Sequence, residues 1–208
     1  MFAPRTGRFL LAVLVLLLVL TLLVALGELP RTVEFALVLA IGYGYWAFFA
    51  AFFRDPERAP GEGIVAPADG RVLLVERSAG RVRLAIFMNV SDVHVNRFPV
   101  DGQVEEIETS GEGFRPAYVP DARHNLQRRY AISTALGPVE VVQMTGMIAR
   151  RLVSFVGVGA VRKKGDRLGM IVLGSRVDLL LPDEAVRMTV RVGDRVRAGV
   201  TTVARERA

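Results

Sequence analysis

The chain has no cysteine and very few histidines or lysines. Its 208 residues include only His94, His124, Lys163 and Lys164 of the last two types. Without cysteine there can be no disulfide, thiolate nucleophile or cysteine-ligated zinc site. Two histidines exclude a three-histidine zinc site, and their spacing excludes an H-E-x-x-H helix. No cluster of other residues argues for a metal site.

Other familiar signatures are missing as well. Neither lysine is followed by Ser or Thr, which excludes a phosphate-binding loop, and no serine lies in a G-x-S-x-G turn. The stretch from Gly61 to Ala66 fits the dinucleotide-binding pattern as a string. However, Pro67 stops any following helix and no strand precedes the glycines, so that match is accidental.

The charge is strongly of one sign. The formal net charge is +6, and almost all of the basic excess is arginine. Such an excess suits anionic partners, either phospholipid headgroups or nucleic acid. The long apolar segments of the chain favour lipid and not nucleic acid. Arg150-Arg151 and the stretch Arg162–Arg167 could be solvated turns or could contact anionic lipid.

Two long apolar runs at the N-terminus predict a transmembrane hairpin. Phe9–Leu26 is an unbroken run of 18 apolar or near-apolar residues, and Val33–Phe53 is broken only by Glu34. Basic residues flank both outer ends, and the turn between the runs is very short. We therefore expect both ends in the cytoplasm, with residues 1–53 serving as the membrane anchor. The basic residues in question are Arg5, Arg8, Arg54 and Arg58.

A cleaved signal peptide and a pair of buried core helices are the alternatives to this hairpin. The first run is longer than a usual signal-peptide core, and a second run follows without a convincing cleavage site. So few polar residues over about 45 positions also make buried core helices a poor interpretation.

Residues 54–208 predict a separate, β-rich domain. Charge, proline and glycine enter abruptly at Arg54–Gly61, and short alternating segments follow between turn residues. Lys164–Gly169 and Val192–Gly199 each contain a Gly-Asp turn followed by a basic residue. Such paired turns are typical of barrel-sandwich-hybrid domains, although ordinary hairpin turns explain them almost as well. The expected strands are 72–75, 81–87, 103–107, 139–142, 170–173, 177–181 and 187–192.

Four short motifs together resemble a known enzyme family. In chain order they are Phe53-Arg54-Asp55-Pro56-Glu57-Arg58, Ala66-Pro67-Ala68-Asp69-Gly70, Asp92-Val93-His94-Val95-Asn96-Arg97-Phe98-Pro99 and Leu173-Gly174-Ser175-Arg176. Their order and sequences are similar to those of phosphatidylserine decarboxylases, especially the short bacterial form. A lone Gly-Ser pair would carry no weight, whereas the ordered set covers nearly the whole chain.

The resemblance implies a self-cleaving proenzyme. Ser175 attacks the carbonyl of Gly174, and the chain splits into residues 1–174 and 175–208, which stay together as a heterodimer. Ser175 becomes a pyruvoyl group, which forms a Schiff base with the serine headgroup of the lipid and accepts the electrons released with carbon dioxide. An electron sink of this kind is what decarboxylation of an α-amino acid requires. Glycine on the acyl side leaves the carbonyl accessible.

The resemblance also implies the acid–base residues. Asp69 and His94 match the family's aspartate and histidine, which act with the serine in the manner of a nucleophilic triad. Longer relatives carry a second histidine where this chain has Arg97. Either His94 serves both self-cleavage and turnover, or Arg97 and another group take one task. Arg97 could instead bind a substrate phosphate or carboxylate. His124 matches no motif position, so we expect it at the surface.

The expected function is therefore decarboxylation of phosphatidylserine to phosphatidylethanolamine at the cytoplasmic face of the cell membrane. One rival is the same chemistry on an archaeal-type serine lipid, whose headgroup is identical. The other is a non-enzymatic, membrane-tethered β-domain that acts as an adaptor, which predicts an intact chain.

Overall fold

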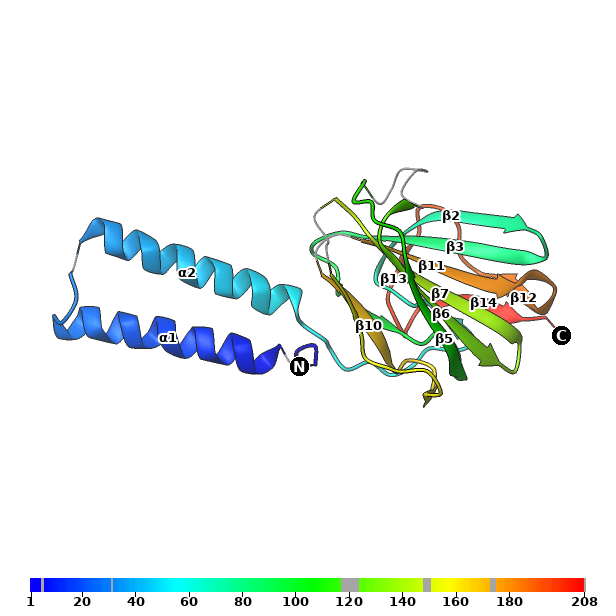
Figure 1. The fold of residues 1–208 in the computed structure, drawn as a ribbon, viewed down its shortest axis with the longest axis horizontal. Coiled ribbons are helices and arrows are strands. Elements are labelled where there is room, and N and C mark those ends of the chain that lie inside the picture. Colours follow the sequence, from blue (N-terminus) through cyan, green and yellow to red (C-terminus); the bar gives the residue numbers. More distant parts are fainter. Residues whose placement is uncertain (5, 31, 117–123, 148–150, 173–174, 208) are drawn as a thin grey trace. The chain divides into compact units, whose positions relative to one another are not determined.

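The computed structural model describes residues 1–4, 6–30, 32–116, 124–147, 151–172 and 175–207 (Figure 1). The chain divides into two compact units, Met1–Pro56 and Glu57–Ala208. The division falls after Pro56, whereas the sequence changes character at Arg54.

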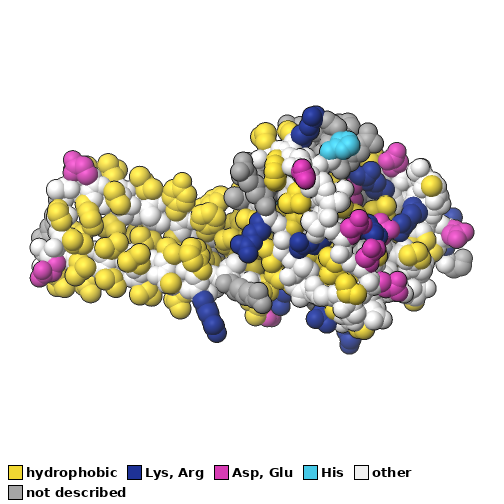
Figure 2. All heavy atoms as spheres, in the orientation of Figure 1, with side chains coloured by type: hydrophobic (Ala, Val, Ile, Leu, Met, Phe, Trp, Pro, Cys, Tyr) yellow, Lys and Arg dark blue, Asp and Glu magenta, His cyan; other side chains and the backbone are white. Residues whose placement is uncertain are grey.

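The first unit is a pair of apolar helices, α1 (Gly7–Leu26) and α2 (Val33–Phe52). Each is long and apolar enough to cross a membrane, and most of their side chains are exposed, unlike those of a core helix. Hydrophobic side chains cover this unit in Figure 2. Gly27, with φ of 86°, ends α1 in the left-handed conformation that favours glycine.

Polar contacts join the two helices along their length. The indole Nε1 of Trp46 donates to the carbonyl oxygen of Leu10 at 2.9 Å, and the hydroxyls of Thr21 and Tyr43 lie 3.0 Å apart. A hydrogen bond between spans is favourable because hydrocarbon offers these groups no other partner. At the base of the hairpin, the N–H of Ala3 donates to the carbonyl of Phe53 at 2.8 Å.

The second unit consists of antiparallel sheets. Its described regular elements are all strands apart from short 3-10 turns. An eight-stranded sheet has the order β13-β2-β3-β11-β7-β6-β5-β9, and two three-stranded sheets have the orders β4-β10-β8 and β1-β14-β12. The strands are β1 (Ile64–Val65), β2 (Gly70–Ser78), β3 (Arg81–Met88), β4 (Val95–Arg97), β5 (Gly102–Ser110), β6 (Gln127–Thr134), β7 (Gly137–Thr145), β8 (Arg151–Ser154), β9 (Val161–Arg162), β10 (Arg167–Val172), β11 (Ser175–Pro182), β12 (Val186–Met188), β13 (Arg195–Val196) and β14 (Thr202–Glu206).

The core is centred on β11, which lies between β3 and β7. Alternate residues of these strands form rows of buried side chains, such as Leu84, Leu179 and Val141, which are neighbours in register. Burying one such side chain contributes about 1.5–3 kcal/mol. The predicted β-rich domain behind two apolar helices is confirmed.

One predicted strand is shorter than expected. The alternating segment 187–192 forms a strand only as far as Met188. The reason is a turn: the carboxylate of Asp194 accepts a hydrogen bond from the N–H of Arg191 at 2.8 Å. The carboxylate of Asp166 accepts from the N–H of Lys163 at 2.9 Å in the same way. The two Gly-Asp segments that resemble each other in sequence therefore form the same kind of side-chain-capped turn.

Candidate active site

The predicted cleavage serine is the first residue of β11. Through its backbone, Ser175 pairs with Met88 at the end of β3 and with Thr145 at the end of β7. Gly174 lies outside the described residues. A break before Ser175 would therefore leave every backbone pairing of β11 in place, because the strand begins only at that residue.

His94 follows a turn that begins after Met88, the residue of β3 that pairs with Ser175. After β3 ends at Met88, the N–H of Asn89 donates to the carboxylate of Asp92 at 2.8 Å. The Nδ1 atom of His94 lies 2.9 Å from the carbonyl oxygen of Asp92. A carbonyl oxygen only accepts, so Nδ1 carries the proton of the neutral ring and Nε2 is its basic nitrogen. The side chain is fully buried, which suits a positioned general base.

A buried polar network lies beside this histidine. The amide of Asn96, on β4, accepts from the Nε2 of Gln143 at 2.7 Å, and the hydroxyl of Tyr130 donates to Gln143 at 3.1 Å. The Nδ2 of Asn96 also approaches the sulfur of Met88 at 3.7 Å. Burial raises the pKa of the Tyr130 hydroxyl above its ordinary value, so the ring stays neutral and remains a donor. The network thus joins β4, which begins directly after His94, to β6 and β7.

Asp69 is held by an arginine from the first motif. The guanidinium of Arg58 donates to both carboxylate oxygens of Asp69, at 2.5 and 2.8 Å. The N–H of Ala198 donates to the same carboxylate at 2.7 Å. Both members of the ion pair are buried, so the carboxylate has a fixed orientation. From the sequence, Arg58 is expected only as a basic residue beside the membrane anchor, and this contact is not predicted, although Arg58 lies within the first motif.

Arg97 is the last residue of β4, three residues after His94. It pairs in register with Arg167, at the start of β10, and its side chain donates to the carbonyl oxygen of Gly165 at 2.9 Å. A Cβ at Gly199 would lie 3.0 Å from the Cδ of Arg97. Because Gly199 has no side chain, it leaves room for the buried side chain of Arg97.

The residue after Ser175 is also fixed by charge. Arg176 donates through Nε to one carboxylate oxygen of Asp178 at 2.6 Å, and Arg83 donates to the other at 2.8 Å. Asp178 and Arg176 are buried. These contacts fix the side chains of the residues that follow Ser175 in β11.

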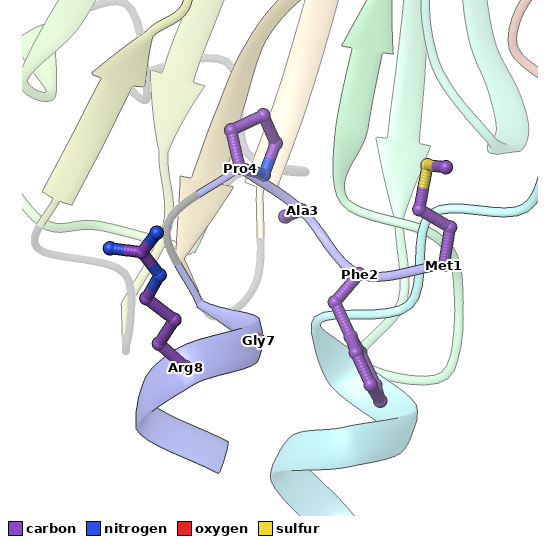
Figure 3. A pocket seen from close by; sticks show the side chains of 6 residues that line it. All are labelled: Met1, Phe2, Ala3, Pro4, Gly7 and Arg8. Carbon is purple, nitrogen blue, oxygen red and sulfur yellow. The ribbon is translucent and has the colours of Figure 1, made fainter. Parts of the chain in front are cut away.

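One hollow lies elsewhere, at the N-terminal end of the helical unit. Figure 3 shows its lining, which consists of Met1, Phe2, Ala3, Pro4, Gly7 and Arg8 around about 880 Å³. None of these described lining residues is predicted for the reaction. This hollow is therefore not the site that the four motifs predict.

Three residues of the polar network are not predicted from the sequence: Asn96, Tyr130 and Gln143. Asn96 lies within the third motif without an assigned role, and Gln143 follows the predicted strand 139–142. A single polar residue next to a predicted buried strand is the signal that could have identified Gln143, because a buried amide requires a partner.

Comparison with known proteins identifies the family of the chain. The family model described as phosphatidylserine decarboxylase matches residues 45–204. A phosphatidylserine decarboxylase proenzyme of Streptomyces avermitilis is 43% identical over 157 residues, which are 74% of this chain and 73% of that protein. The chain belongs to the phosphatidylserine decarboxylase family.

Two further relatives of this decarboxylase family extend the comparison. A phosphatidylserine decarboxylase proenzyme of Thermobifida fusca is 40% identical over 189 residues, covering 90% of this chain and 85% of that protein. A Halobacterium salinarum protein, named provisionally as an archaetidylserine decarboxylase proenzyme, is 45% identical over 169 residues, or 79% and 84% of the two chains. These relatives therefore carry names for two different lipid substrates.

Proposed function

We propose that this family member decarboxylates a serine phospholipid, phosphatidylserine in the first instance, with a pyruvoyl group made from its own Ser175. The observation that carries the proposal is the Gly174-Ser175-Arg176 motif of a family member at the first residue of a central strand. The buried His94 directly precedes β4, and its carbonyl oxygen accepts from the N–H of Ile171 near the end of β10.

The residues around Ser175 fit such a group. A base with a defined acceptor nitrogen is available in His94, and the N-terminal residue of a new chain would begin a strand that is paired on both sides. The two lysines do not offer an alternative electron sink through a bound aldehyde cofactor. Both lie in the turn before β10, and the ammonium of Lys164 donates to the carbonyl of Gly63 at 3.1 Å.

Self-cleavage would proceed through an ester. The hydroxyl oxygen of Ser175 attacks the carbonyl carbon of Gly174, the C–N bond breaks, and the freed nitrogen takes the hydroxyl proton. Removal of the Ser175 α-proton then expels the Gly174 carboxylate and leaves dehydroalanine. Water converts this to a ketone and releases ammonia. His94 is the proposed proton acceptor, because Arg97 stands where longer relatives carry a second histidine.

During turnover the pyruvoyl ketone supplies the electron sink that the departing carboxylate requires. His94 would return a proton to the α-carbon of the headgroup, a role that histidine side chains often fill as general acids. Asp69 acts through its ion pair with Arg58, which fixes the loop before β2. This role for Asp69 is one of positioning.

The two products of cleavage would remain one molecule. Residues 175–208 supply β11 to the centre of the large sheet, and also β12, β13 and β14. Residues 1–174 supply the neighbours of β11 on both sides. Separating the chains would require breaking the core itself.

A serine lipid with an archaeal-type glycerol core is the second candidate substrate. The 45% identity to the Halobacterium protein favours it as much as the 43% identity to the Streptomyces protein favours phosphatidylserine. The headgroups are identical, so parallel assays with both lipids are needed. In either case the helices α1 and α2 would keep the enzyme in the bilayer that holds its substrate, with the second unit in the cytoplasm.

The deciding experiment is the intact mass of the detergent-purified chain beside its Ser175→Ala variant. We expect the wild-type chain to split after Gly174 into two fragments, with a blocked amino group on the shorter one, and the variant to stay whole. Release of carbon dioxide from phosphatidylserine should accompany splitting. A wild-type chain that stays whole and behaves like the variant would refute the proposal and favour the adaptor function.

A further inference from the structure

A second, cationic hollow lies at the far end of β10 from the cleavage site. It encloses about 350 Å³, and all of its lining residues belong to the second unit. Four of them are basic and two are acidic: Arg58, Arg97, Lys164, Arg167, Glu57 and Asp166. An excess of positive charge in a hollow of this size suits a small anion.

Two of the basic side chains are buried and held in place. Arg58 has 4% of its side chain exposed and is fixed by Asp69, and its buried Nε has no hydrogen-bond acceptor among the described residues. A buried donor of this kind is costly unless water or a ligand accepts from it. Arg97 has 6% of its surface exposed and donates through its Nη1 to the carbonyl oxygen of Gly165. These guanidinium groups are therefore ordered before any ligand arrives.

The other two cations are partly exposed at the hollow. The ammonium of Lys164 donates to the carbonyl oxygen of Gly63 at 3.1 Å, which leaves two of its three protons for other acceptors. The carboxylate of Asp166, by contrast, already accepts the N–H of Lys163. Phosphate oxygens accept several charge-assisted hydrogen bonds at once, and guanidinium groups match their geometry.

We propose that this hollow binds a phosphate group. The ligand is either the headgroup of an anionic phospholipid or a soluble phosphate.

The two adjacent lysines give the test a matched control. Lys164 lines the hollow, whereas its neighbour Lys163 is exposed and does not, so Lys164→Gln and Lys163→Gln remove the same charge one residue apart. The full-length Ser175→Ala chain is used in uncharged detergent micelles. It cannot self-cleave, so the result is independent of the proposed reaction. Calorimetric titrations with inorganic phosphate and with short-chain phosphatidylglycerol, at constant chloride, measure both ligands.

We expect saturable binding that Lys164→Gln weakens about tenfold, the loss of one charged hydrogen bond. Lys163→Gln should leave the affinity within about twofold. Tighter binding of phosphatidylglycerol would identify a lipid headgroup as the ligand, and tighter binding of inorganic phosphate a soluble one. Arg167→Gln serves as a second pocket variant, and unchanged thermal unfolding confirms that each variant folds. No saturable binding of either ligand, or equal weakening by the two lysine variants, would overturn the proposal.

Discussion

The two histidines of the chain differ in every property that matters for proton transfer. His94 is fully buried and its Nδ1 is committed to a backbone carbonyl, which leaves one defined basic nitrogen. His124 is exposed, as the sequence analysis expects. A general base needs such a fixed orientation, because proton transfer depends on distance and alignment as well as on pKa.

Replacing His94 should abolish turnover selectively. We expect His94→Gln to lower the rate of decarboxylation by about 100-fold or more, the usual contribution of general acid–base catalysis. His124→Gln is the control and should keep the wild-type rate. The measurement is carbon dioxide release from phosphatidylserine in mixed micelles, and a wild-type rate for His94→Gln would exclude its role. Intact mass of the same variant tells whether His94 also serves self-cleavage.

The ion pair of Arg58 and Asp69 should matter mainly for stability. Arg58→Met leaves a buried carboxylate without its partner, and we expect a loss of about 3–5 kcal/mol in unfolding free energy. The exposed pair of Arg205 and Glu62 is the matched comparison, and Arg205→Met should cost less than about 1 kcal/mol. Denaturant unfolding in detergent measures both. Equal effects would show that the buried pair is not a special contact.

At the scale of elements, the small sheet β4-β10-β8 connects the two ends of the site. Its strand β4 begins next to His94 and ends at Arg97, while β10 leads from the cationic hollow towards Ser175. Gly169 in β10 allows its neighbours to approach closely. A Cβ there would lie 2.6 Å from the carbonyl oxygen of Val153 and 2.9 Å from the Nε2 of Gln143.

Gly169→Ala should therefore disturb both the sheet and the polar network. We expect it to destabilise the chain by about 1–3 kcal/mol, the usual cost of forcing an extra carbon into a packed site. Gly157→Ala is the control, because a Cβ at Gly157 meets nothing within 4 Å. Thermal unfolding and the rate of chain splitting are the measurements. A Gly169→Ala chain as stable as the control would show that β8 and β10 accommodate the extra carbon without a loss of unfolding free energy.

At the scale of the whole molecule, the chain combines an apolar helical unit with a charged β-rich unit. Figure 2 shows hydrophobic side chains over the helices and charged side chains over the second unit. The first unit has the length and composition of a hairpin that crosses a membrane twice. The advantage of such an anchor is that the acyl chains of a lipid substrate never need to leave the bilayer.

The absence of cysteine makes the membrane topology easy to test. Glu28, between the helices, and Ser78, at the end of β2, are both exposed. In cells, a membrane-impermeant maleimide should label Glu28→Cys from outside and Ser78→Cys only after lysis, because basic residues flank the outer ends of both helices. The cysteine-free parent chain reports the background. Labelling of Ser78→Cys in intact cells would place the second unit outside.

The sequence by itself determined the two apolar helices, the β-rich second unit and most of its strands. These features depend on composition and on alternation along the chain, which are local properties. Through four motifs it also singled out Ser175 and His94, whose roles stay predictions. The length of the last predicted strand was wrong because a side chain, Asp194, closes a turn that alternation cannot reveal.

Only the tertiary structure decided which partners the site residues have. Arg58 meets Asp69 across 11 residues, Gln143 meets Asn96 across 47, and Arg97 meets Gly165 across 68. Such pairs follow from the order of strands in the sheets, which no local pattern encodes. The same order brings Ser175 between Met88 and Thr145 and gathers four cations at the other end of β10. The physical reason is that hydrogen bonds and burial between distant segments are satisfied only in the assembled fold.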